Sequence, residues 1–164
     1  MKARLLPYDA LGSMRLRALL HGDARLTEHD GFSWMGGQWI YEGVGFTWFG
    51  RLKDQPETTQ RVEIAFDEIS PDVVARILGA LGLPLCPGMQ IEQLNGVLGQ
   101  IETAERFVSD RATYNFRVGT PESYQVGCTV HETDGLIHVS LIRSDTRRRL
   151  AVAKQHAQNR LPTG

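Results

Sequence analysis

Residues 125–143 read Gln125-Val-Gly-Cys-Thr-Val-His-Glu-Thr-Asp-Gly-Leu-Ile-His-Val-Ser-Leu-Ile-Arg143. Apolar and polar residues alternate on both sides of Asp134-Gly135, and a period of two is typical of strands with one buried face. Asp-Gly suits the two positive φ angles of a type I′ turn. We therefore predict a β-hairpin with a two-residue turn, in which His131 lies opposite His138 and Val130 lies opposite Val139.

The predicted hairpin has one dry face and one wet face. The dry face carries Val126, Cys128, Val130, Ile137, Val139 and Leu141, and the wet face carries Thr129, His131, His138 and Ser140. A three-residue turn would mix the two faces, so the pattern favours the tighter register. We expect the four polar residues of the wet face to contribute to a binding surface.

Helix start and stop signals define the chain before this hairpin. Ser70 is a suitable N-cap and Pro71 suits the first helical position, and apolar residues then recur at helical spacing to Leu81. Gly82 ends this helix. We predict a second, shorter helix over 91–98, strands near 105–109 and 112–118, and a last helix over 146–158.

The first half is rich in aromatic residues and glycine between positions 32 and 50. Aromatic residues favour strands, and interspersed glycines mark bulges or turns. We predict strands near 38–42, 44–50 and 61–67, whereas 9–21 fits either a helix or a pair of strands. The predicted fold class is therefore α+β, with antiparallel meander sheets packed with short helices. We expect one compact domain over 1–164; two diverged similar halves, 1–69 and 70–164, are an alternative that the sequence leaves open.

Composition narrows the class of protein. The chain has 164 residues, of which 41% are hydrophobic and 23% charged, as in ordinary globular proteins. A formal charge of −1 argues against a dedicated nucleic-acid binder. Two cysteines, Cys86 and Cys128, are too few for a disulfide scaffold, and we expect both to be small buried residues. No signal peptide or membrane-spanning run is expected, so the default is a bacterial cytoplasmic protein.

Several short motifs resemble a known module. They are Pro87-Gly88-Met89, Gln93-Leu94, Val97-Leu98-Gly99 and Tyr114-Asn-Phe116, followed by the hairpin. Residues 85–143 resemble in this respect the helix-loop-helix and antiparallel-sheet module of small outer-membrane assembly lipoproteins, which the β-lactamase inhibitor proteins use in tandem. The resemblance implies a module that binds other proteins, often through its sheet. It implies no particular site residues.

No catalytic or metal-binding constellation stands out. Two directly opposed histidines could share a metal ion, but the sequence fixes no third ligand, so we expect partner-facing or solvent-facing histidines and no metal. Cys128 falls on the dry face and no Gly-x-Ser-x-Gly motif is present, which disfavours a nucleophile. We therefore favour a non-catalytic protein over an enzyme and expect no cofactor.

The aromatic segment 32–49 gives the remaining candidates. Trp39 and Trp48 could form a binding surface, because tryptophan dominates such sites, or they could belong to the core. The leading hypothesis is a protein that binds another protein, of the inhibitor or immunity type. The alternatives are a small-ligand binder or enzyme with an aromatic-lined cleft in residues 32–66, and a binder of acidic partners through Arg147, Arg148 and Arg149. The sequence leaves self-association open.

Overall fold

A computed structural model describes residues 2–26, 32–35, 38–42, 48–52 and 59–146. Its strands form one antiparallel sheet in the order β1-β2-β3-β4-β8-β7-β6-β5. The strands are β1 (Phe32–Met35), β2 (Gln38–Glu42), β3 (Trp48–Leu52), β4 (Arg61–Ala65), β5 (Ile101–Val108), β6 (Arg111–Val118), β7 (Tyr124–His131) and β8 (Gly135–Arg143). Both halves of the chain thus contribute to the same sheet, and β4 and β8 pair at its centre.

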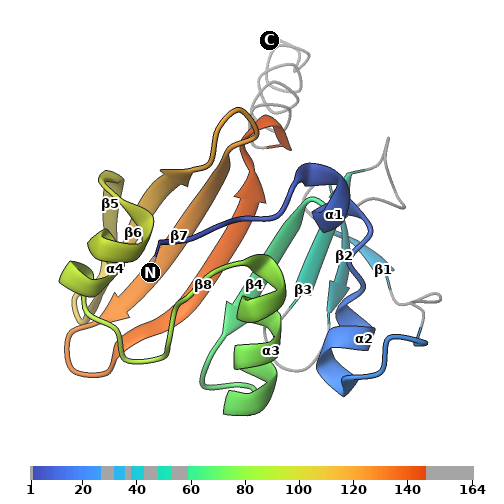
Figure 1. The fold of residues 1–164 in the computed structure, drawn as a ribbon. Coiled ribbons are helices and arrows are strands. Elements are labelled where there is room, and N and C mark those ends of the chain that lie inside the picture. The colour runs from blue at the N-terminus through green and yellow to red at the C-terminus, as the bar shows by residue number, and fades with distance from the viewer. Residues whose placement is uncertain (1, 27–31, 36–37, 43–47, 53–58, 147–164) are drawn as a thin grey trace, which may run out of the picture.

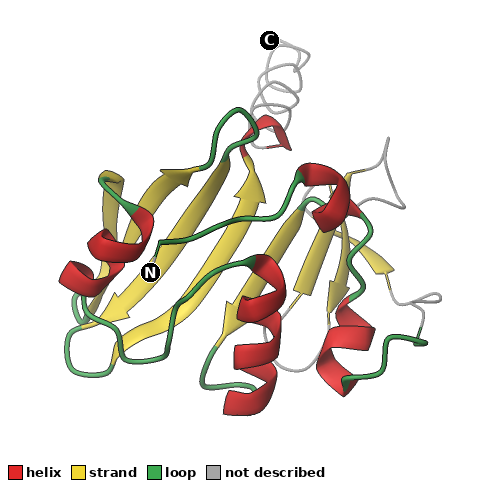
Figure 2. Ribbon diagram, in the orientation of Figure 1, coloured by secondary structure: helices red, strands yellow, loops and turns green. Residues whose placement is uncertain are grey.

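Among the described residues, the helices α1 to α4 lie on one side of this sheet, facing the viewer in Figures 1 and 2. They are α1 (Tyr8–Gly12), α2 (Leu16–His21), α3 (Pro71–Leu81) and α4 (Ile91–Leu98). Along the chain, two helices are followed by a four-stranded meander, and this succession occurs twice: α1, α2 and β1–β4, then α3, α4 and β5–β8. The fold is therefore α+β, with antiparallel meanders and short helices as the sequence predicts.

The core lies between the sheet and these helices. Val62 and Ile64 of β4, together with Val139 and Leu141 of β8, are almost fully buried because they alternate toward the helices. The helices supply apolar side chains from one face each: Val74, Ile77, Leu78 and Leu81 from α3, and Leu94 and Leu98 from α4. The spacing of apolar residues in the sequence therefore predicts the buried faces of α3 and α4 correctly.

Most predicted elements are confirmed, with changes at their ends. The helices over 71–81 and 91–98 and the strand over 38–42 have the predicted bounds. Residues 9–21 form the helices α1 and α2, so the strand alternative is wrong. The strand expected at 105–109 is the longer β5, and β1 was not predicted. The helix expected over 146–158 lies almost wholly outside the described residues, as do Arg147, Arg148 and Arg149.

The hairpin register differs from the predicted one. His131 pairs with Gly135 around a three-residue turn, and a bulge follows before Thr129 pairs with His138. His131 and His138 are therefore not opposite each other, and Val139 pairs with Cys128 instead of Val130. The bulge also makes Leu136 the buried residue, whereas Ile137 is half-buried.

The chain between α3 and α4 explains this register. The Gly88 N–H donates to the carbonyl oxygen of Leu136 at 3.0 Å, and the Leu136 N–H donates to that of Met89 at 2.9 Å. Gly135 has φ 71° and lies so close to Gly88 that a side chain would not fit between them. The start of β8 is thus fixed by hydrogen bonds to residues 88 and 89, which hairpin rules do not consider.

Candidate functional site

We call the side of the sheet opposite the four helices the open face. Alternate residues of the central strands point to it: Arg61, Glu63, His138, Ser140, Ile142, Gln125, Thr129, Thr113, Asn115 and Arg117. Most of these side chains are half-buried and polar, in contrast to the buried apolar residues that alternate with them. The structure therefore confirms the two-faced hairpin and extends its polar face across four strands.

The predicted site residues do not all come together. Thr129, His138 and Ser140 share the open face, and Thr129 pairs directly with His138. In the backbone register Trp48 of β3 pairs with Glu63 of β4, and Glu63 pairs in turn with Ser140 of β8. Trp39 lies on β2, further from the hairpin, and pairs with Trp34 and Arg51. The exposure of the two tryptophan side chains falls outside what the structure describes.

His131 holds the turn of the hairpin. Its Nδ1 accepts hydrogen bonds from the backbone N–H groups of Thr133 and Asp134, each at 3.2 Å. This network places the ring proton on Nε2, which donates to Asp110 Oδ2 at 3.2 Å. A hydrogen bond from Arg111 is the main reason that the pKa of Asp110 falls to about 2. Both ring nitrogens of His131 are thus engaged locally.

Arg61, Glu63 and His138 form a group that we call the junction cluster, because it lies where β4 meets β8. Arg61 Nη2 lies 3.2 Å from Glu63 Oε2, and His138 Nε2 lies 3.9 Å from Glu63 Oε1. The Glu63 side chain is only 13% exposed. Burial lowers the pKa of His138, an effect that Glu63 and Asp67 oppose and Arg61 reinforces. The cluster therefore combines a shielded carboxylate with an imidazole that favours its neutral form.

The pKa of His138 predicts a dependence of stability on pH. Unfolded His138 has an ordinary pKa near 6.5 and binds a proton more readily than folded His138 does. The free energy of unfolding should therefore fall as the pH drops below about 6.5. Urea denaturation at pH 7.5 and pH 5 should show this loss, and His138→Gln should reduce it. The exposed His21→Gln is the matched control; an unchanged pH dependence in His138→Gln would contradict the assignment.

Hydroxyl and amide groups continue the open face beyond the junction cluster. Thr113 Oγ1 and Thr129 Oγ1 lie 3.0 Å apart, and Asn115 Nδ2 donates to Thr103 Oγ1 at 3.0 Å. Between Asn115 and Ser140 lies Gly127, where a Cβ atom would meet Ser140 Oγ at 2.6 Å. Gly127 thus lets these two polar side chains close over the backbone of β7.

Sequence reasoning missed several residues of this face. Arg61 and Glu63 alternate with the apolar residues of β4, and Thr113 and Asn115 alternate with those of β6. That alternation was the available signal. It could not show that the two strands lie on either side of the hairpin, because β4 joins β8 from the other half of the chain.

The open face therefore presents charged, hydroxyl and amide groups. Cys128 lies on the core side, where burial raises the pKa of its thiol to about 12 and keeps it protonated. Cys86 is exposed, so its predicted burial is wrong. Within the described residues, no three His, Cys, Asp or Glu side chains gather as metal ligands. None of the described helices has the length and apolar composition to cross a bilayer.

Comparisons of this chain with protein-family models, with curated proteins and with solved structures gave no match. The chain is an α+β protein with four described helices on one side of an eight-stranded sheet, and the central strands direct mostly polar residues to the other side.

Proposed function

We propose that this protein acts without catalysis, by binding another protein through the open face of β4, β8, β7 and β6. One observation carries the proposal: the four described helices lie on the same side of the sheet and leave the polar side without a described helix over it (Figure 1). Apolar faces are buried on folding, whereas a broad, ordered polar face is available to a partner. An inhibitor or immunity-type protein in the cytoplasm fits this arrangement.

The charges of the open face favour a protein partner over a nucleic acid. Arg61 is matched by Glu63 at 3.2 Å, and Arg117 is matched by Glu102 at 2.8 Å. Binding to phosphate backbones needs an excess of unmatched lysine and arginine. Balanced charges with hydroxyl and amide groups are instead typical of protein interfaces, which are polar and hydrated at their rims.

A capture experiment with matched variants tests the proposal. The tagged protein is used to capture partners from lysate of its host at moderate salt, alongside Thr129→Arg on the open face and Asn95→Arg on α4. Both substitutions add the same side chain, one on each side of the sheet. Circular dichroism and the melting temperature establish that both variants are folded.

We expect one stoichiometric partner that binds the wild type and Asn95→Arg but is lost by Thr129→Arg. A bulky charge in the centre of an interface prevents close packing and typically costs more than tenfold in affinity. A partner retained equally by both variants would place the binding surface elsewhere. The absence of any partner, with soluble folded bait, would contradict the proposal.

The junction cluster favours a second candidate, a small-ligand binder or enzyme. Glu63 and His138 could exchange a proton with a ligand, and Trp48 pairs with Glu63, so the aromatic segment borders the cluster. A ligand of this kind should raise the melting temperature of the wild type, and Glu63→Gln should remove that shift. A shift that survives Glu63→Gln would exclude the junction cluster as its site.

A further inference from the structure

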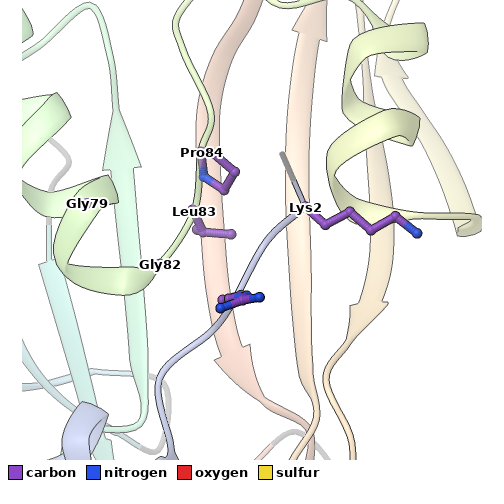
Figure 3. A pocket seen from close by; sticks show the side chains of 6 residues that line it. Lys2, Gly79, Gly82, Leu83 and Pro84 are labelled. Carbon is purple, nitrogen blue, oxygen red and sulfur yellow. The ribbon is translucent and has the colours of Figure 1, made fainter.

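A hollow of about 490 Å³ lies on the helix side of the sheet, away from the open face. It is lined by Lys2, Arg4, Gly79, Gly82, Leu83 and Pro84. Figure 3 shows Gly79, Gly82, Leu83 and Pro84 on the α3 side of this hollow and Lys2 across from them on the N-terminal segment. Its volume is in the range of sites for small molecules.

Two glycines, Gly79 and Gly82, line this hollow. Gly79 lies inside α3, and no atom would come within 4 Å of a Cβ atom added there. Gly79 thus borders the hollow without contributing a side chain to it. Any larger side chain at this position would project toward the hollow. Gly82 differs, because its φ of 77° and its contact with the Arg4 carbonyl both require glycine.

The rim of the hollow offers cations without matched anions. The side chains of Lys2 and Arg4 are exposed and form no ion pair within the part of the chain that the structure describes. Backbone carbonyl groups nearby are already hydrogen bonded: Gly82 N–H donates to Gly79, and Arg4 N–H donates to Gly82. Lys2 and Arg4 therefore bring two cations to the edge of a hollow that Leu83 and Pro84 also line.

We propose that this hollow binds a small amphipathic carboxylate. The apolar body lies over Leu83, Pro84 and Gly79, and the carboxylate accepts hydrogen bonds from Lys2 and Arg4. Charge-assisted hydrogen bonds of this kind are the stronger ones in proteins. The site is separate from the open face, so a ligand and a protein partner could be bound together.

Isothermal titration calorimetry with decanoate tests this site in the whole protein. Decanol, which has the same body without the charge, and acetate, which has the charge without the body, show which feature is recognised. Gly79→Leu fills the hollow. Gly96→Leu is its matched control, because Gly96 is also an exposed glycine inside a helix with open space around it but does not line the hollow.

We expect one decanoate per chain and binding that is at least tenfold weaker for decanol and for acetate. Gly79→Leu should weaken decanoate binding at least tenfold, whereas Gly96→Leu should leave it within twofold of wild type. The double variant Lys2→Gln/Arg4→Gln should weaken decanoate about tenfold, as the loss of a hydrogen bond to a charged group does, and leave decanol unchanged. Equal losses in Gly79→Leu and Gly96→Leu, equal binding of decanol and decanoate, or no binding of decanoate would overturn the proposal.

Discussion

Gly135→Ala is expected to lower the free energy of unfolding by about 3 kcal/mol or more. The left-handed φ of 71° costs about 1–2 kcal/mol for alanine. The new Cβ would also collide with the Gly88 carbonyl oxygen and lie 2.8 Å from the Gly88 Cα, so the backbone must separate. Separation breaks the hydrogen bonds of Leu136 with Gly88 and Met89, each contributing about 1 kcal/mol. Urea denaturation measures the loss.

Gly88→Ala is the control that separates the cost of a positive φ angle from the cost of the close contact between residues 135 and 88. Gly88 has a similar φ of 87°, but the nearest atom to an added Cβ is the Asp134 oxygen at 3.8 Å, an ordinary contact. Only the conformational cost of about 1–2 kcal/mol should remain. If Gly88→Ala and Gly135→Ala lose the same stability, the close approach of the two chain segments is not what fixes the start of β8.

Phe116→Ala is expected to cost about 3–5 kcal/mol, the usual range for removing a fully buried phenylalanine. The Phe116 side chain is 0% exposed, and in the sheet it lies between Ile101 of β5 and Val126 of β7. Its removal leaves a cavity that strands on both sides cannot close without moving. Thermal and urea unfolding should both report the loss.

Phe107 provides the matched comparison within the same protein. It lies on β5, only one strand away, and its side chain is 87% exposed. Phe107→Ala should therefore change the free energy of unfolding by no more than about 0.5 kcal/mol. A loss comparable to that of Phe116→Ala would mean that Phe107 is buried in solution, which would contradict its exposed position on β5.

Local signals in the sequence were sufficient for the elements and their buried faces. Ser70-Pro71 and Gly82 delimit α3, and alternation assigns Val126 and Cys128 to the core and Thr129 to the open face. Both kinds of signal depend on neighbours in the sequence, through backbone conformation and side-chain period. The α+β class and the two-faced hairpin follow from them.

Contacts between segments far apart in the sequence determine the hairpin register and the junction cluster, and the sequence pattern predicted neither. The hairpin register depends on Gly88 and Met89, so the histidines do not lie opposite each other, and Leu136 is buried where the sequence pattern predicted Ile137. The junction cluster needs Glu63 and His138 side by side, which only the pairing of β4 with β8 provides. The polar positions were thus predictable one strand at a time, but their combination into a site was not.

The pairing of β4 with β8 also sets the order in which the chain can fold. Every other pair of described strands joins strands that follow each other in the sequence, whereas this pair brings Arg61 beside Ile142. Pairing of distant segments slows folding, because a long stretch of chain must be ordered first. Until synthesis passes residue 143, β4 has no partner on one edge, and unpaired edges invite association between chains. The centre of the finished sheet is therefore the last part of it that a growing chain can complete.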